Sequence, residues 1–131
     1  MVIDTSAMMS MIRREPEAEP FARAVHADPK RLVSVISLVE AGIVVERQFG
    51  AAGSRELDYI IERFKLTIVP VSVEIGRGAL LAFWRFGKGV HPAGLNFGDC
   101  FVYALARSLG EPLLFKGEDF SRTDVRPVFW R

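Results

Sequence analysis

Four carboxylates, those of Asp4, Glu40, Asp99 and Asp119, stand where a strand is expected to end or a helix to begin. In a chain whose strands and helices alternate, such positions meet at the carboxyl edge of one sheet, so acids far apart in sequence can form one cluster. Neighbouring carboxylates raise one another's pKa unless a cation compensates their charge, and an all-oxygen site suits Mg²⁺ or Mn²⁺. The pattern therefore predicts a metal-dependent reaction on a phosphate-rich substrate.

The first two acids also have structural explanations. A carboxylate at Asp4 would stabilise the positive end of the helix that follows. Thr5 and Ser6 already offer capping oxygens there, so a buried acid beside them needs another reason. Glu40 follows Ser37 at the spacing of a capping box, in which two side chains satisfy backbone groups at a helix start. Asp4 therefore favours a functional role, whereas Glu40 is open between a cap and a ligand.

The local sequence also leaves the roles of Asp99 and Asp119 undecided. Asp99 would occupy the third helical position behind an Asn96 cap, but Gly98 removes a side chain beside it and lets another group approach closely. Asp119 follows the fourth expected strand in what could be a simple polar turn. Two further acids compete with it for the fourth place in the cluster, Glu118 and Asp124. The joint placement of the acids at one sheet edge, rather than any single residue, carries the prediction.

The elements that position these acids follow from hydrophobic periodicity, β-branched runs and breaks at Gly or Pro. Strands are expected over residues 1–4, 31–35, 66–69, 112–115 and 126–130. Helices are expected over residues 7–12, 17–27, 37–49, 54–64, 72–86 and 96–109. Strands that alternate with helices predict a mainly parallel sheet covered on both faces. The expected fold class is therefore α/β, a three-layer α/β/α sandwich formed by one domain over residues 1–131.

The bulk composition agrees with this fold and indicates the class of partner. A chain of 131 residues, 50% hydrophobic and 25% charged, can bury a core of its own. No apolar run approaches a membrane span and no basic leader opens the chain, so we expect a cytoplasmic location and no membrane partner. The net charge is +1, but if the four acids bind metal, 17 basic residues face 12 remaining acidic ones. That balance of +5 favours a polyanionic partner.

Other common chemistries find no support in the sequence. There is no P-loop motif, and no GxGxxG motif follows a strand, so the usual modes of nucleotide binding are not indicated. His26 and His91 lack the spacing of a zinc pair and are expected in loops or on the surface. The single Cys100 lies on the apolar stripe of its helix, which is typical of a core residue.

Two clusters in the second half of the chain call for a partner. Residues 77–96 contain no acid and three basic side chains, those of Arg77, Arg85 and Lys88. Such a stretch could hold phosphates beside the metal site, or form an ordinary solvated loop. Residues 83–86 are more aromatic than one helix needs for its core, which indicates a protein interface that includes Trp84.

Four strings of residues together resemble a known family. They are residues 2–7 (VIDTSA), 37–41 (SLVEA), 95–100 (LNFGDC) and 116–120 (KGEDF). In this order and spacing they resemble the PIN-domain ribonucleases, and more narrowly the VapC-type toxins of bacterial toxin–antitoxin pairs. The resemblance spans the whole chain, and the combination is far more specific than any one string.

The resemblance implies a PIN-like α/β/α fold and a Mg²⁺- or Mn²⁺-dependent endoribonuclease. By position, Asp4 and Asp99 would be the principal metal ligands, and Glu40 and Asp119 would complete the acidic quartet, with a hydroxyl of Thr5 or Ser6 nearby. The expected partners are an RNA substrate, a cognate antitoxin and a second copy of the chain in a homodimer. Two alternatives stay open: a module that binds RNA or antitoxin without turnover, and a PIN nuclease of RNA processing that has no antitoxin.

Overall fold

The computed structural model describes residues 1–131. The strands are β1 (Val2–Ile3), β2 (Leu32–Ser34), β3 (Thr67–Val69) and β4 (Leu113–Leu114). The helices are α1 (Thr5–Ile12), α2 (Ala18–Ala27), α3 (Val35–Phe49), α4 (Ala51–Arg63), α5 (Val73–Phe86), α6 (Phe97–Leu109) and the 3₁₀ helix η1 (Phe120–Arg122). None of the helices has the length and apolar character that a membrane crossing needs.

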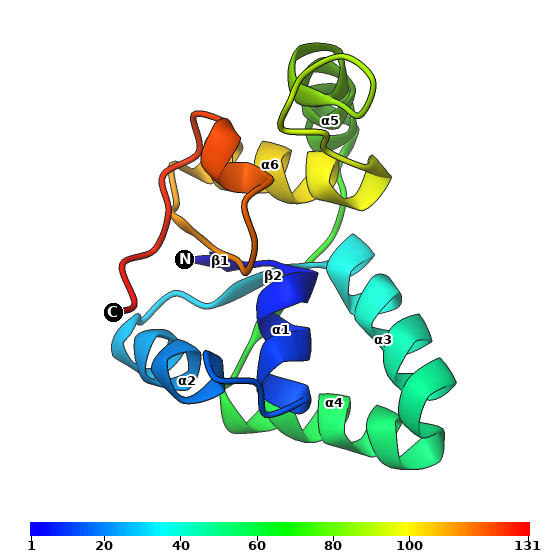
Figure 1. The fold of residues 1–131 in the computed structure, drawn as a ribbon, viewed down its shortest axis with the longest axis vertical. Helices are drawn as coiled ribbons and strands as arrows, with labels where there is room; N and C mark the ends of the chain where they lie inside the picture. Colours follow the sequence, from blue (N-terminus) through cyan, green and yellow to red (C-terminus); the bar gives the residue numbers. More distant parts are fainter.

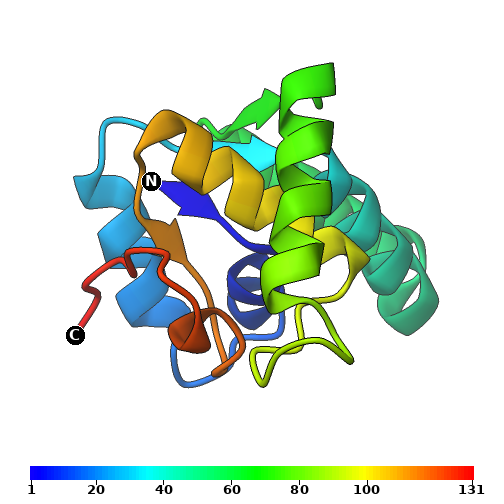
Figure 2. The same cartoon turned by 90° about the horizontal axis from the view of Figure 1, so that it is seen from above.

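The strands form one parallel sheet in the order β3-β2-β1-β4, with helices on both faces, as predicted (Figures 1 and 2). Helices α5 and α6 cover one face, and α1 to α4 cover the other (Figure 1). Successive strand residues point to opposite faces. Val2 and Leu113 therefore join the core beneath α5 and α6, whereas Ile3 and Leu114 join the core on the α1 side. The result is a three-layer α/β/α sandwich with a core on each side of the sheet.

The strand order reverses beside β1. The chain runs from β1 outward to β2 and β3, and later returns to place β4 on the other side of β1. In open α/β sheets, ligands bind outside the carboxyl ends of the strands at such a reversal. Asp4 follows β1 directly, so the topology places this acid at the expected binding edge.

The start of β1 is fixed by the amino group of Met1. This buried ammonium donates to Asp28 Oδ2 at 2.9 Å, to Glu111 Oε2 at 2.9 Å and to Lys30 O at 2.7 Å. A buried charge is stable only when it is paired and hydrogen-bonded, and here both conditions are met. The cluster holds β1 between the turn before β2 and the start of β4, three residues before Asp4.

The tail and the start of the fourth helix differ from the sequence-based predictions. Residues 126–130 do not form a fifth strand: Pro127 makes one parallel bridge with Leu113. The tail then packs Trp130 edge-on against Phe21, with ring centroids 4.9 Å apart, instead of continuing along β4. The fourth helix begins at Ala51 rather than at residue 54, because a single residue with a positive φ of 63°, Gly50, makes the whole turn after α3.

Candidate functional site

Asp4 caps α1 with its own side chain. Its Oδ2 accepts from Ser6 N at 3.0 Å and from Ser6 Oγ at 2.6 Å. The prediction that Thr5 or Ser6 caps this helix is wrong, because both residues already lie in its first turn. Only 5% of Asp4 is exposed, and burial raises the pKa of its carboxyl against the lowering effect of the Ser6 hydrogen bonds, with the charge of Glu40 raising it further.

Ser6 also connects β1 to the chain that follows β4. Its Oγ donates to Asp4 and accepts from the backbone N–H of Lys116 at 2.9 Å. Asp4 N in turn donates to Leu114 O at 2.9 Å. These bonds hold the segment that leads to Asp119 against the carboxyl end of β1.

Glu40 is not part of a capping box. Strand β2 runs into α3 without a loop, and Ser34 is the cap, accepting from Ile36 N at 3.2 Å. Glu40 is therefore the sixth residue of α3, beyond the first turn, and the predicted capping by Ser37 is wrong. Instead Glu40 Oε1 accepts from Thr5 Oγ1 at 2.9 Å, which points its carboxylate toward the end of β1. The structure thus excludes the helix-cap explanation of Glu40.

Gly98 provides the space that Glu40 occupies. A Cβ atom at this position would lie 2.1 Å from Glu40 Oε2 and 2.6 Å from its Cδ. The sequence-based expectation that Gly98 permits a close approach is confirmed, and the group that approaches is a second acid of the cluster. This contact joins α3 to the start of α6.

Asp99 completes the capping box at the start of α6, and its carboxyl has a raised pKa. The predicted capping arrangement is confirmed: Asn96 Oδ1 accepts from Asp99 N at 2.9 Å, and Asp99 Oδ2 accepts from Asn96 N at 3.0 Å. Burial and then the charges of Asp4, Asp119 and Glu40 raise the pKa of the Asp99 carboxyl to about 7, although the Asn96 hydrogen bond acts to lower it. Asp99 therefore lies within electrostatic reach of the three other acids singled out in the sequence.

The structure separates the three acids that compete for the fourth place. Asp119 is exposed just before η1, and its charge acts on Asp99. Glu118, 82% exposed, pairs with Arg122 at 3.5 Å. Asp124 accepts from the Tyr103 hydroxyl and from Arg85 at 3.2 Å, on the side of η1 that faces α5. Asp124 is thus held by other partners, and among these three acids only Asp119 has a charge that acts on Asp99, which favours Asp119 as the fourth acid.

The oxygen atoms of the acid cluster are of the kind that bind a hard divalent cation, but the side chains do not surround a common point. No three His, Cys, Asp or Glu side chains already stand as a ready ligand set. Asp4 and Glu40 instead direct oxygens to the Ser6 and Thr5 hydroxyls, an arrangement that separates like charges. All the converging donors are carboxylate or hydroxyl oxygens, the ligands that Mg²⁺ and Mn²⁺ prefer. Each of these carboxylates keeps a second oxygen that makes no hydrogen bond to these hydroxyls, so Asp4 and Glu40 can bind a cation without losing them.

The other residues considered in the sequence lie apart from this cluster. His91 Nδ1 accepts from Ala93 N at 3.0 Å, and His26 packs against the ring of Phe64 with centroids 4.8 Å apart. Cys100 is buried in the core as predicted, and burial with the nearby Asp99 charge raises its thiol pKa to about 11. The sequence reading missed the arginines of α6 and η1, which follow Asp99 along the chain without any recognisable motif.

Comparison with known proteins places the chain in a family. The PIN domain family model matches residues 1–126. Ribonuclease VapC30 of Mycobacterium tuberculosis is 50% identical over 128 residues, covering 98% of each chain. Ribonuclease VapC of Mycolicibacterium smegmatis is 51% identical over 128 residues, covering 98% of this chain and 99% of its own.

Solved structures show the same fold at lower identity. The crystal structure of Mycobacterium tuberculosis VapC20, a sarcin-ricin loop cleaving toxin, has a TM-score of 0.74 at 18% identity, covering 96% of this chain and 98% of its own. VapBC2 from Rickettsia felis, bound to a DNA fragment from its promoter, has a TM-score of 0.77 at 14% identity, covering 96% and 94%. With the family model and the VapC relatives, the conclusion is direct: the chain belongs to the PIN-domain family and, within it, to the VapC ribonucleases.

Proposed function

We propose that this protein is a metal-dependent endoribonuclease, the toxin of a toxin–antitoxin pair, which hydrolyses RNA phosphodiester bonds in the cytoplasm. The observation that carries the proposal is the position of Glu40, whose carboxylate accepts from Thr5 beside Asp4 and fills the space at Gly98 beside Asp99. Burial and the charges of Asp4, Asp119 and Glu40 accordingly raise the pKa of the Asp99 carboxyl to about 7. Such a concentration of negative charge at the reversal point of the sheet is expected of a cation site. The relatives named ribonucleases support the same reaction class.

Within this proposal, each residue has a role at the end of β1. Asp4 and Asp99 are the metal ligands, since both are buried or half-buried acids whose carboxyls face the cluster. Glu40 and Asp119 orient the attacking water, and Thr5 holds the Glu40 carboxylate in place. When bound, the ion supplies Lewis-acid polarisation of a phosphoryl oxygen and a bound water of lowered pKa. The cofactor is Mg²⁺, with Mn²⁺ as an alternative.

The test is an incubation of the purified protein with RNA in Mg²⁺ or in EDTA. Cleavage in Mg²⁺ that EDTA abolishes is the expected result, because the clustered carboxylates need a cation to compensate their charge before a phosphate can approach. A gel shift without cleavage products in Mg²⁺ would instead identify a binding module without turnover. A short antitoxin gene beside the gene of this chain would distinguish a toxin from a PIN nuclease of RNA processing.

Gly98 offers a second test of the acidic quartet, through Glu40. Gly98→Ala is expected to lower RNA cleavage about a hundredfold, because the new Cβ displaces the Glu40 carboxylate and small displacements at a reacting centre are costly. The fold should persist, since the atoms that must move end a flexible side chain, and alanine favours the helix. Gly42→Ala in α3, where a Cβ meets nothing within 4 Å, is the matched control. Equal cleavage by both variants would contradict a role for Glu40.

The proposed protein partners are a cognate antitoxin and a second copy of the chain. Related solved structures include VapBC-1 from nontypeable Haemophilus influenzae and a toxin-antitoxin complex from Klebsiella pneumoniae, with TM-scores of 0.75 and 0.71. Large apolar side chains of α3, α5 and α6 are open to solvent in the isolated chain, as such contacts require: Val39, Ile43, Leu80, Leu81, Phe83, Trp84 and Phe97. An exposed surface of this kind is typical of an interaction site.

Trp84 is the residue that tests this interface. Its side chain is 62% exposed, so Trp84→Ala removes apolar area without opening a cavity in the core. We expect weaker self-association or weaker antitoxin binding, by tenfold or more for a central aromatic contact, as measured by analytical ultracentrifugation. Tyr59→Ala on α4, where the side chain is 54% exposed, serves as the control. Unchanged sedimentation of both assemblies in Trp84→Ala would remove Trp84 from the interface.

A further inference from the structure

A groove of about 800 Å³ runs between α5 and α6, and arginines dominate its polar lining. Arg77 and Arg85 come from α5, and Arg107 comes from α6. Glu74 is the one acid among the residues that line it. We call this feature the arginine groove. It contains two of the three basic residues that the acid-free stretch 77–96 contributes.

Most of the hydrogen-bonding capacity in the arginine groove is free. Asp124, itself held by the Tyr103 hydroxyl, accepts one hydrogen bond from Arg85 at 3.2 Å and lies 3.9 Å from Arg107. Arg77 makes no ion pair. Each guanidinium carries five N–H donors, so a single carboxylate can orient these side chains but cannot satisfy them. The groove therefore presents oriented donors to a ligand that is rich in anionic oxygens.

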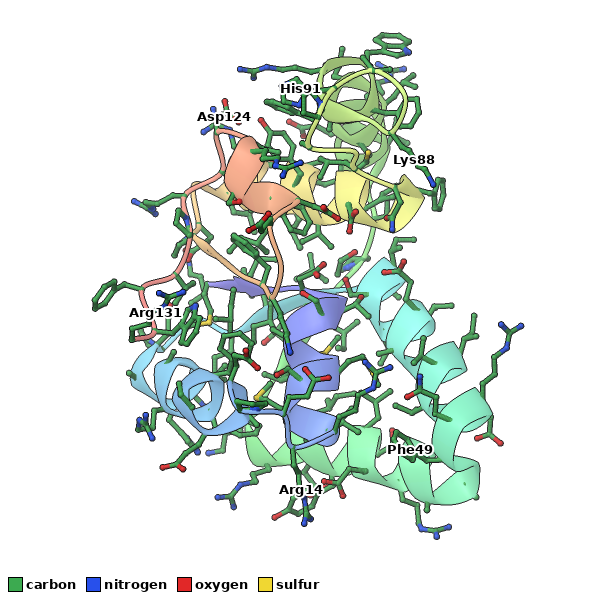
Figure 3. All side chains as sticks on the ribbon, in the orientation of Figure 1. Arg14, Phe49, Lys88, His91, Asp124 and Arg131 are labelled. Carbon is green, nitrogen blue, oxygen red and sulfur yellow. The ribbon has the colours of Figure 1, made fainter.

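The arginine groove lies close to the acid cluster. Asp99, Tyr103 and Arg107 follow one another at intervals of four on α6, so about 12 Å of helix separates the first from the last. That distance is spanned by three or four nucleotides at about 3.4 Å per phosphate of a stacked strand. The 3₁₀ helix η1 connects the two sites along the chain: Asp119 precedes its first residue, and Asp124, labelled in Figure 3, lies two residues beyond its last residue.

η1 adds a further cation to this route. Arg122 is half-exposed and donates to Pro92 O at 3.1 Å, which connects η1 to the loop between α5 and α6. Arg122 follows Asp119 by three residues, and Asp124, which accepts from Arg85, follows Arg122 by two. The positions thus form a basic route from the acids to the groove.

We propose that the arginine groove binds the backbone of the RNA strand that the acid cluster cleaves, and holds phosphates several nucleotides from the scissile bond. The inference rests on the proposed function for the identity of the substrate. Guanidinium forks match phosphate oxygens in two parallel hydrogen bonds, which a point charge such as lysine does not provide. Repeated phosphates along one strand also fit arginines arrayed along a groove better than the scattered carboxylates of an acidic peptide.

The test compares two double variants that change the net charge equally. Arg77→Gln with Arg107→Gln alters the groove, and Arg47→Gln with Arg55→Gln, on α3 and α4, is the matched control because these arginines are exposed and make no ion pair. Binding of a single-stranded RNA oligomer is measured by fluorescence anisotropy in EDTA at about 50 to 200 mM salt. We expect the groove variant to bind about tenfold more weakly, with a salt slope smaller by about 1.4 for two lost phosphate contacts. The control should match wild type.

Cleavage kinetics and a protein-like probe complete the experiment. In Mg²⁺ the groove variant should have a higher KM and an unchanged kcat, because these contacts form before the reaction and persist through it. A groove variant that binds RNA with the affinity and salt slope of the control overturns the proposal. So does one that keeps RNA binding but loses binding of an oligoglutamate peptide, which would make the groove a protein contact. Since binding is measured in EDTA, a wild-type protein that fails to cleave RNA refutes the proposed function separately from the groove.

Discussion

Replacing Asp99 by asparagine is expected to reduce Mg²⁺-dependent RNA cleavage by about a thousandfold or more while leaving the fold intact. A metal ion contributes several kcal/mol of charge stabilisation in such a reaction, and each 1.36 kcal/mol corresponds to a factor of about ten in rate. Asparagine keeps an oxygen that can accept from Asn96 N, so the capping arrangement of α6 survives. The loss would therefore report on metal binding rather than on the helix.

Asp4→Asn should behave in the same way, because asparagine is as good a helix cap as aspartate and can still accept from Ser6 N. Asp58→Asn, an exposed position on α4, controls for the removal of one negative charge. We would measure cleavage rates at several Mg²⁺ concentrations and check the fold of each variant by circular dichroism. Full Mg²⁺-dependent cleavage by either Asp4→Asn or Asp99→Asn would remove that residue from the metal site.

The sequence predicted those elements whose signals are local. The start of α6 is an example: Asn96 and Asp99 form the expected cap, and Gly98 permits the expected close approach of another group. The start of α3 was misplaced because β2 and α3 join without a loop, so Ser34 ends one element and caps the next. No turn residue marks that boundary. The sequence favours Ser37 as the cap because Glu40 follows it at the spacing of a capping box.

The parts that failed depend on contacts between distant residues. The tail was expected to be a strand from its β-branched and aromatic residues, but the packing of Trp130 on Phe21, more than a hundred residues earlier, decides its path. The fourth acid was open among three candidates for the same reason. Asp124 could be set aside only after Tyr103 and Arg85 were found around it, 21 and 39 residues away. Alternation of strands and helices predicted that acids would follow the strands at one edge of the sheet, but it could not show which of them are already paired.

The charge that makes the site suitable for a cation should also destabilise the metal-free protein. We expect its free energy of unfolding to fall as the pH rises from about 5.5 to about 8. Burial and the charges of Asp4, Asp119 and Glu40 raise the pKa of the Asp99 carboxyl from 3.8 to about 7. Below about pH 7 the native carboxyl keeps a proton that the unfolded chain has lost, and it releases this proton as the pH rises through about 7. The native state therefore binds more protons, and stability declines with pH, by roughly 2 kcal/mol in total.

Acids outside the cluster affect the free energy of unfolding in a different pH range. Hydrogen bonds and ion pairs hold the pKa values of Asp28 and Glu111 below their ordinary values, against the opposing effect of burial. Their stabilisation is present above about pH 4.5 and is lost as the pH falls through their native pKa values. Urea unfolding between about pH 5.5 and pH 8 in EDTA therefore isolates the raised carboxyls of the cluster.

Asp99→Asn should flatten this pH dependence, so that at pH 8 the variant is more stable than wild type in EDTA. Mg²⁺ should then stabilise wild type at pH 8 and have little effect on the variant, because only wild type gains a bound ion on folding. Below about pH 7 the stabilisation by Mg²⁺ should weaken, since a proton competes with the ion for the same carboxyl. Parallel stability curves for the two proteins would mean that Asp99 ionises normally, and that the four acids are too far apart to share a cation.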